Sequence, residues 1–408
     1  MKKVFKVGLA FGLVVLAGMC CSSAFVQGVN IGINTASADA GWVSETSAKN
    51  TDKTLNITAR AAFLLEGNSG KVLFAKDADK QLPIASMVKI MTLAVIYDAL
   101  EVGQIKMTDE VMVSRNASGM GGSQAFLDFD SSYKVEELIK SIVLASANDS
   151  CVAMAELIAG NEDDFVVKMN ELAAKLGMKN TSYVNCTGLP AVGGYSSARD
   201  SAIVYSYIMK SPFYSLFNNV WMYDLTHPSG RVTGLTNTNK HARFYQGCEG
   251  GKTGFTSESG HCITVAALRR NLKPIAVIVG AGNSQTRFDE SRALMDYVFD
   301  NYDNKLVVSS AQSIGSVKVK KAVIDSVQVF PRENFYDLVK KGDKQVPSVN
   351  VELVDSVKAP IGRADAVGKV IVTEDGKVVA EIDVVIGEDV KAMNYLDAVR
   401  KVINKFKL

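Results

Sequence analysis

The sequence predicts an α/β (α+β) domain with a helical insertion, followed by a small all-β domain and a C-terminal amphipathic helix. Strand patterns stand at both ends of the segment 56–302, and long helical patterns lie between them. This order indicates one sheet assembled from both ends of the segment, with an all-helical insertion between them. After residue 307 the composition shifts to valine and lysine in short alternating runs, which is typical of strands.

The chain begins with a segment that predicts a signal peptide over residues 1–40. Basic residues near the start precede an apolar stretch that ends near residue 19, and two small-x-small triplets end at Ala38 and Ala40. This pattern predicts export and cleavage near residue 39 or 41. The apolar stretch is short for a membrane span. Cys20 and Cys21 are poor lipidation sites, because Met19 and Cys20 stand where a small residue is needed.

The first large domain is assigned to residues 41–305. Its strands are predicted from apolar runs bounded by turn residues, at 61–66, 71–75, 262–268 and 274–279. Its helices are predicted from apolar residues at helical spacing, at 88–100, 135–146, 150–160, 163–176 and 294–299. The 408 residues allow two or three domains and a large core.

A β-rich domain is assigned to residues 306–389, and it carries no catalytic constellation. Residues 317–320 and 349–353 alternate apolar and polar side chains, and Asp375-Gly376 between two apolar runs predicts a hairpin. Residues 390–408 repeat apolar side chains at helical spacing, with basic residues elsewhere. Such a helix can lie on an anionic membrane surface or pack on its own domain, and the pattern alone favours packing.

Composition and cysteine spacing exclude several classes of function. Lys and Arg number 45 and Asp and Glu 43, so the net charge of +2 gives no indication of a nucleic-acid partner. The four cysteines beyond the signal segment can form disulfides after export or stay as buried thiols; they are Cys151, Cys186, Cys248 and Cys262. Their spacing resembles no zinc motif, and the three histidines form no His-Glu-x-x-His, so neither a metal nor a cofactor is expected.

Three short motifs carry the chemistry. They are Ser86-Met87-Val88-Lys89, Ser146-Ala147-Asn148 and Lys252-Thr253-Gly254, in that order. Together they predict a serine acyl-transfer site in which a lysine, not a histidine, activates the nucleophile. A phosphate-binding loop is disfavoured because Gln246 stands where that loop needs glycine, and no Gly-x-Ser-x-Gly elbow indicates a histidine-based hydrolase.

Context singles out the first motif. A second Ser-x-x-Lys, from Ser131 to Lys134, lies in a polar segment, whereas Ser86 opens an apolar run that predicts a buried helix. Residues three apart share a helix face, so Lys89 can reach the Ser86 hydroxyl. Burial also lowers the pKa of a lysine, as a base near neutral pH requires. Lys89 could instead extend to solvent from a surface helix, but the other two motifs argue against that alternative.

The first two motifs are assigned separate roles. Ser86 is the predicted nucleophile and Lys89 its base. Ser146 and Asn148 are expected in a loop between two helices, where the hydroxyl can relay a proton to the leaving amine and the amide can hold the substrate's peptide group. Taken singly, Ser146 could cap a helix and Asn148 could lie in a turn.

The third motif is expected on a strand that lines the site. Lys252 would supply a positive field, Thr253 a hydrogen bond to a substrate carboxylate, and Gly254 room for the substrate beside the strand. The simplest oxyanion donors are the backbone N–H groups of Ser86 and Phe255.

With these motifs the chain resembles the penicillin-binding D-alanyl-D-alanine carboxypeptidases, from about residue 61 to the C-terminus. Further matching motifs are Gly121-Gly122-Ser123, Asn148-Asp149, Asn180-Thr181, Gly188-Leu189, Ser196-Ser197-Ala198-Arg199-Asp200 and Asn237-Thr238-Asn239. The resemblance implies a serine β-lactamase-like catalytic domain, a β-rich stalk and a C-terminal amphipathic anchor. It therefore favours membrane association of the last helix. It also implies that Arg287 helps to position the substrate's terminal carboxylate.

The resemblance implies that Ser86 cleaves the terminal D-alanine from peptidoglycan stem peptides ending in D-Ala-D-Ala through an acyl-enzyme, and that β-lactams acylate the same serine. It places the protein outside the cytoplasm, on the outer face of the cytoplasmic membrane. Phe255 stands where the family often has histidine or tyrosine, Ser259 where alanine is usual, and Asp130-Ser131 where Gly-Glu is frequent. The alternatives are a D,D-endopeptidase, a β-lactamase, which the second domain disfavours, and a penicillin-binding wall protein without turnover.

Overall fold

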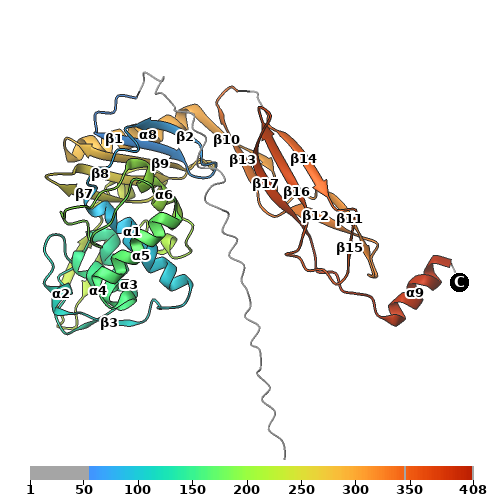
Figure 1. Ribbon diagram of the computed structural model, residues 1–408, viewed down its shortest axis with the longest axis horizontal. Coiled ribbons are helices and arrows are strands. Elements are labelled where there is room, and N and C mark those ends of the chain that lie inside the picture. The colour runs from blue at the N-terminus through green and yellow to red at the C-terminus, as the bar shows by residue number, and fades with distance from the viewer. Residues whose placement is uncertain (1–54, 344–345, 407–408) are drawn as a thin grey trace, which may run out of the picture. The chain divides into compact units, whose positions relative to one another are not determined.

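The computed structural model of the chain describes residues 55–343 and 346–406. The predicted signal peptide, 1–40, lies outside the described residues. The remainder contains a mixed α/β domain and a β domain, followed by one terminal helix, so the predicted fold class is confirmed (Figure 1).

The mixed domain is built on a five-stranded antiparallel sheet in the order β2-β1-β9-β8-β7. Its strands are β1 (Ala61–Glu66), β2 (Val72–Lys76), β7 (Cys248–Thr256), β8 (Gly260–Ala267) and β9 (Pro274–Ala281). Because β1 pairs with β9, the sheet joins the two ends of the domain, as the sequence predicts. The edge strand β7 carries the Lys-Thr-Gly motif.

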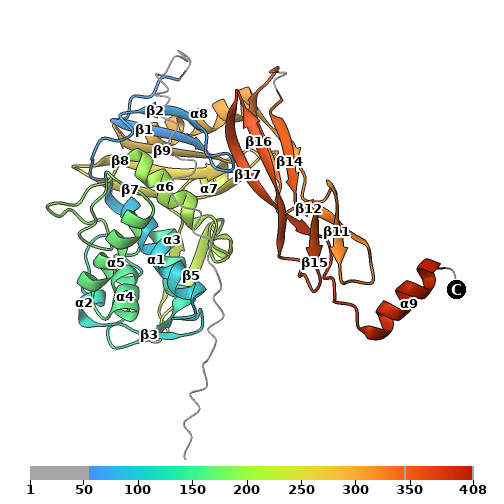
Figure 2. The same ribbon diagram turned by 45° about the vertical axis from the view of Figure 1, so that its right-hand side comes forward.

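Helices cover both faces of this sheet. Successive side chains of a strand point to opposite faces, so neighbouring residues of β1 belong to different cores. Ala62 and Leu64 of β1 pack in one core with helix α8 (Ser284–Asn301). Phe63 and Leu65 pack in a second core with the inserted helices (Figures 1 and 2). The inserted helices are η1 (Ala85–Val88), α1 (Lys89–Glu101), α2 (Arg115–Ser118), α3 (Val135–Ala145), α4 (Asn148–Ala159), α5 (Glu162–Lys175), α6 (Ala198–Ile208), η2 (Tyr214–Leu216) and α7 (His241–Phe244).

Two small antiparallel strand pairs, helix α6 and the start of α8 were not predicted. β3 (Glu110–Met112) pairs with β4 (Ser132–Lys134), and β5 (Met222–Thr226) forms a hairpin with β6 (Val232–Thr236). Helix α8 was expected only at 294–299, but it begins ten residues earlier, where Asn283 caps it by accepting a 2.8 Å hydrogen bond from the Thr286 N–H. The polar first half of α8 lacks the apolar periodicity on which the prediction rested.

The β domain contains a two-stranded and a six-stranded sheet. The first pairs β10 (Tyr302–Val308) with β13 (Phe335–Lys340), and the second has the order β14-β16-β17-β12-β11-β15. The strands of the second are β11 (Gly315–Lys320), β12 (Ser326–Pro331), β14 (Ser348–Leu353), β15 (Ser356–Lys358), β16 (Ala366–Glu374) and β17 (Lys377–Ile386). Asp375 and Gly376 join β16 to β17 with positive φ angles of 49° and 76°, as the hairpin signal predicts.

The terminal helix α9 (Tyr395–Phe406) leaves large apolar side chains in solvent. Leu396 is 64% exposed, Val402 56% and Ile403 43%. Within the described residues, no helix is both long and apolar enough to span a membrane. The four cysteines of the described chain are all buried free thiols, so the disulfide alternative is not realised.

Candidate active site

Ser86 lies in the short turn η1, immediately before the buried helix α1. The preceding residue, Ala85, has a φ of +48°, a strained value for a residue with a side chain. The turn has tight neighbours on two sides. A Cβ on Gly254 would lie 2.7 Å from the Ile84 carbonyl oxygen, and one on Gly188 would lie 2.1 Å from that of Ala85. Glycine is therefore required on both sides of the nucleophile's turn.

Lys89, the first residue of α1, is completely buried beside Ser86. Its Nζ donates a hydrogen bond of 3.0 Å to the Ser86 Oγ and a second, short one to the Thr187 carbonyl. Burial lowers the pKa of the Lys89 ammonium. The N-terminal end of a helix, where partial positive charge gathers, acts in the same direction. Lys89 is thus held in contact with the hydroxyl whose proton it is predicted to accept.

The second motif contacts the third. Ser146 ends α3 in the left-handed conformation, with φ 60° and ψ 36°, and Asn148 is the first residue of α4. The Lys252 Nζ donates a 2.8 Å hydrogen bond to the Ser146 Oγ. The expected loop between the two helices is thus reduced to Ser146 and Ala147. The tight turn directs the Ser146 hydroxyl toward the Lys-Thr-Gly strand.

Asn148 is fixed by the neighbouring loop, and one of its atoms remains unused. Its backbone N–H donates to the Ser123 carbonyl at 2.7 Å, and its Nδ2 donates to the Gly121 carbonyl at 2.6 Å. Its Oδ1 is buried without a hydrogen-bond partner. A buried amide oxygen is costly to leave unpaired, so Asn148 retains an acceptor for an N–H group of a bound peptide.

Lys252 and Thr253 lie on β7. Lys252 is 3% exposed, and burial together with the charge of Lys89 lowers its pKa well below the usual value. Because the charge of Lys89 acts on Lys252 in a buried site, the pair favours holding fewer than two protons. The Thr253 Oγ1 donates a 2.8 Å hydrogen bond to the Thr238 Oγ1.

Arg287, in the first turn of α8, contacts the strands β7 and β8. Its Nη1 donates to the carbonyl oxygens of Gly254 and Cys262, at 3.1 Å and 3.3 Å, and its Nε is buried without a partner. Burial lowers the pKa of this guanidinium. In this arrangement Arg287 braces the Lys-Thr-Gly strand. Phe255 is 58% exposed and stacks on His261, with ring centroids 4.3 Å apart.

The predicted site residues therefore converge from α1, the α3–α4 turn and β7. Sequence reasoning assigned no role to Thr187, Thr238 or Asp149. Asp149 is buried and accepts 3.1 Å hydrogen bonds from the N–H groups of Ala125 and Leu127, which anchors the loop beside Asn148. The only available signal was that Thr238 and Asp149 fall inside matching family motifs. Nothing local to Thr187 indicates that its carbonyl accepts from a lysine 98 residues away.

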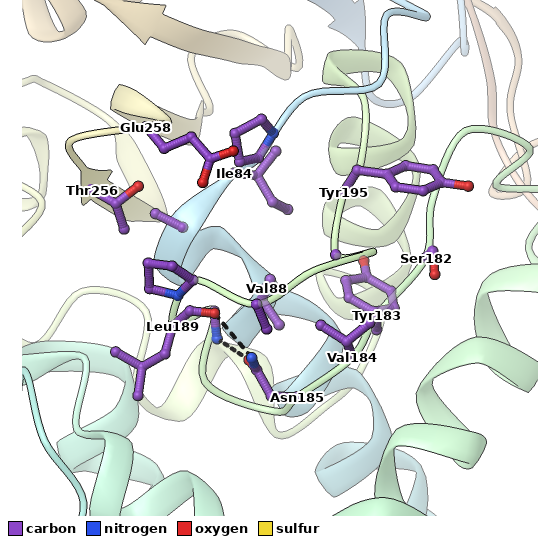
Figure 3. A pocket seen from close by; sticks show the side chains of 16 residues that line it. Ile84, Val88, Ser182, Tyr183, Val184, Asn185, Leu189, Tyr195, Thr256 and Glu258 are labelled. Atoms are coloured by element: carbon purple, nitrogen blue, oxygen red, sulfur yellow. Dashed lines mark hydrogen bonds between the residues drawn. The ribbon is translucent and has the colours of Figure 1, made fainter.

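A pocket with an empty space of about 480 Å³, its open mouth included, adjoins the turn of Ser86 (Figure 3). Ile84, Ala85 and Val88 form its base. Figure 3 shows Thr256 and Glu258 on one side and Tyr195 and Ser182 on another, with Leu189 nearby. Its loop wall is fixed by Asn185, whose Nδ2 donates to the Leu189 carbonyl at 3.0 Å.

Comparison with known proteins agrees with this geometry. Residues 45–283 match the family described as D-alanyl-D-alanine carboxypeptidase, and residues 302–392 match the C-terminal domain of penicillin-binding protein 5. The D-alanyl-D-alanine carboxypeptidase DacF of Bacillus subtilis is 38% identical over 353 residues, which cover 86% of this chain and 91% of DacF. The D-alanyl-D-alanine carboxypeptidase DacA of Haemophilus influenzae is 29% identical over 344 residues, which cover 82% of this chain and 86% of DacA.

Solved structures of similar proteins share the fold. The crystal structure of penicillin-binding protein 5 from Haemophilus influenzae has a TM-score of 0.66 and 29% sequence identity, and covers 82% of this chain and 98% of its own. That of PBP3 from Streptococcus pneumoniae, described as a peptidoglycan synthesis regulatory factor, has a TM-score of 0.70 and 25% identity, with 83% and 100% covered. The chain thus belongs to the D-alanyl-D-alanine carboxypeptidase family, whose members resemble penicillin-binding protein 5 in fold.

Proposed function

We propose that the protein is a serine-type carboxypeptidase that removes the terminal D-alanine from peptidoglycan stem peptides ending in D-Ala-D-Ala. The observation that carries the proposal is the 3.0 Å hydrogen bond from the Lys89 Nζ to the Ser86 Oγ. It joins a nucleophile to a buried amine whose pKa is lowered, the pairing that lysine-activated serine chemistry requires.

Acylation begins when neutral Lys89 accepts the Ser86 hydroxyl proton and the Oγ attacks the carbonyl carbon of the penultimate D-alanine. The carbonyl oxygen becomes an oxyanion, which accepts hydrogen bonds from the backbone N–H groups of Ser86 and Phe255. When the peptide bond breaks, the amine of the terminal D-alanine needs a proton. Ser146 supplies it and regains one from Lys252, to which it is hydrogen bonded at 2.8 Å. An ester between Ser86 and the shortened peptide remains.

The other residues of the site hold the substrate. The unpaired Oδ1 of Asn148 accepts from the peptide N–H before the scissile bond. The Thr253 hydroxyl donates a hydrogen bond to the terminal carboxylate of the substrate, and the positive charges of Lys252 and Arg287 attract it. The carboxylate therefore binds beside the Lys-Thr-Gly motif of β7.

The proton that Lys89 took from Ser86 first passes to Lys252, which gave up its own to Ser146, so that Lys89 is neutral again. Water then hydrolyses the Ser86 ester: Lys89 takes a proton from the attacking water and returns it to the Ser86 Oγ as the ester bond breaks. β-Lactams, which mimic the peptide, acylate Ser86 by the same route.

Release of D-alanine tests this proposal against an endopeptidase. We expect the protein without residues 1–40 to release D-alanine from a peptide ending in D-Ala-D-Ala and to leave a cross-linked peptidoglycan dimer largely intact. Ser86→Ala should abolish release, because no other group replaces the nucleophile. Ser131→Ala, in the second Ser-x-x-Lys, is the matched control and should retain activity.

Two results would count against the carboxypeptidase. Cleavage of the dimer without D-alanine release favours the endopeptidase, a class represented by a Pseudomonas aeruginosa D-alanyl-D-alanine endopeptidase that is 27% identical over 242 residues. A stable penicillin adduct without any peptide turnover favours a wall-binding protein.

We further propose export by the 1–40 segment and peripheral attachment to the outer face of the cytoplasmic membrane through α9. The exposed apolar side chains of α9, Leu396 and Val402 among them, support attachment, together with its basic residues. The purified protein should co-sediment with anionic phospholipid vesicles, and Leu396→Glu should weaken this binding. Equal sedimentation of both proteins would rule out attachment through this face.

A further inference from the structure

The loop 121–128 holds Asn148 in place, although the chemistry proposed above gives this loop no role. The Gly121 carbonyl accepts from the Asn148 Nδ2, and the Ser123 carbonyl accepts from the Asn148 backbone N–H. Gly122 between them approaches so closely that a Cβ there would lie 2.8 Å from the Asn148 Nδ2. With its Nδ2 held in this way, the amide offers its unpaired Oδ1 to a bound peptide. The orientation of Asn148 therefore depends on how the loop itself is held.

The loop contains a strained residue, Phe126, whose φ of +61° is rare for a large side chain. Such a conformation persists only where its surroundings impose it. The Asp149 carboxylate supplies one constraint, because it accepts hydrogen bonds of 3.1 Å from the N–H groups of both neighbours, Ala125 and Leu127. The second constraint is a hydrogen bond from the Arg231 Nη2 to the Phe126 carbonyl oxygen. Arg231 stands 105 residues further along the chain, in the turn of the β5–β6 hairpin.

This hairpin turn, residues 227–231, grips the end of the loop at several atoms. His227 and Arg231 close the turn through a 2.8 Å hydrogen bond from the His227 N–H to the Arg231 carbonyl. Arg231 also donates a 2.7 Å hydrogen bond to the Asp128 Oδ1. His227, which is buried, bonds to the Tyr133 hydroxyl at 2.7 Å, and that hydroxyl oxygen accepts a 3.0 Å hydrogen bond from the Asp128 N–H. Residues 126–128 are thus held by Arg231 directly and by His227 through Tyr133.

The hydrogen bonds of the turn require a neutral His227. The Arg231 Nη2 lies 3.1 Å from the His227 Nδ1, and a guanidinium can only donate, so this nitrogen must be the acceptor. The His227 Nε2 then carries the proton and donates to the Thr233 Oγ1 at 2.7 Å. Burial and the charge of Arg231 lower the pKa of His227, which keeps the ring neutral. Glutamine has one acceptor and one donor group, so it can replace a neutral imidazole at this position.

We propose that Arg231 and His227 are positioning residues for Asn148, because they hold the loop in the strained form that directs the Asn148 Oδ1 to an N–H of the substrate. The inference rests on the carboxypeptidase function, in which this N–H precedes the scissile bond. When the hairpin turn is detached, Phe126 relaxes from its positive φ and the Gly121 carbonyl no longer holds the Asn148 Nδ2. The amide can then rotate, and the substrate loses its acceptor.

The test compares two substrates that differ only in the N–H that Asn148 is proposed to bind. One is diacetyl-L-lysyl-D-Ala-D-Ala. In the other, D-lactate replaces the penultimate D-alanine, so an ester oxygen takes the place of the N–H while the scissile amide is unchanged. Wild-type protein should release D-alanine from the first substrate with a kcat/KM about three- to tenfold higher, the scale of one hydrogen bond.

Variants of the hairpin turn should lose this preference. Arg231 is 42% exposed, so Arg231→Leu should keep the fold, slow the amide substrate to the rate of the lactyl substrate, and leave the lactyl substrate unchanged. His227→Leu should have the same effect, whereas His227→Gln should retain the wild-type preference. Asp224→Asn, which changes an exposed carboxylate on β5 of the same hairpin, is the matched control and should also retain it.

Hydrogen exchange provides a second measurement. The amides of Ala125 and Leu127 should lose protection in Arg231→Leu but not in Asp224→Asn, because the loop opens when the hairpin turn is detached. Unchanged protection, equal slowing of both substrates by Arg231→Leu, or equal turnover of both substrates by the wild type would overturn the positioning role and leave the carboxypeptidase intact. Absence of D-alanine release from both substrates in the wild type would instead overturn the proposed function, and the positioning role with it.

Discussion

Replacement of Lys89 by methionine should slow acylation of the protein by benzylpenicillin by about 10²- to 10⁴-fold, the usual contribution of a general base. The Lys89 Nζ lies 3.0 Å from the Ser86 Oγ, so its loss leaves the hydroxyl without an acceptor for its proton. Acylation is followed as the rate at which the intact mass of the protein increases. Methionine fills similar space without a buried amine, so the fold should be retained.

The matched control for this variant is Lys168→Met, which removes an exposed lysine on α5. It should acylate at the wild-type rate. Both variants should melt in a single transition, so that slow acylation cannot be attributed to unfolding. Acylation of Lys89→Met within a few-fold of the wild-type rate would show that another group activates Ser86.

Replacement of Lys252 by methionine should lower acylation at neutral pH by about 10²-fold and move its pH dependence upward. Lys89 accepts a proton only while it is neutral, so acylation rises with pH through the apparent pKa of the lysine pair. The charge of Lys252 disfavours a second charge on Lys89, since the coupling of two titrating groups is mutual. Without Lys252 the pKa of Lys89 increases, and neutral base appears only at higher pH.

The measurement is the rate of benzylpenicillin acylation across a pH series for wild type and Lys252→Met. The variant's rising limb should lie at higher pH, and part of its deficit should disappear there. The remaining deficit reflects the lost hydrogen bond to the Ser146 Oγ. A uniform loss at every pH would assign Lys252 to substrate binding alone and would remove its influence on Lys89.

Local patterns predicted the parts of the site that lie within one turn of chain. Ser86 and Lys89 meet because they stand three residues apart at the start of α1. The hairpin at Asp375 and Gly376 was predictable for a similar reason, since both residues tolerate the positive φ that a tight turn needs. The order of the three motifs indicated the chemistry before any geometry was known.

Contacts between distant segments were beyond the reach of these patterns. Gly254 was expected to leave room for substrate, and the structure adds a second requirement: a Cβ at this position would lie 2.7 Å from the Ile84 carbonyl oxygen and 3.1 Å from the Ser86 backbone nitrogen. Gly188 makes the same close approach from a loop about 100 residues away from the turn. Such requirements arise only when the sheet and the helices meet, so they leave no periodic trace in the sequence.

Peptide mapping of the benzylpenicillin adduct identifies the nucleophile. Signal-free protein is incubated with benzylpenicillin, digested, and searched by mass spectrometry for the modified serine. We expect a penicilloyl group on the peptide that contains Ser86, its absence in Ser86→Ala, and its persistence in Ser131→Ala. A penicilloyl group on any other residue, or wild-type protein that remains unmodified, would contradict the assignment of Ser86 as the nucleophile.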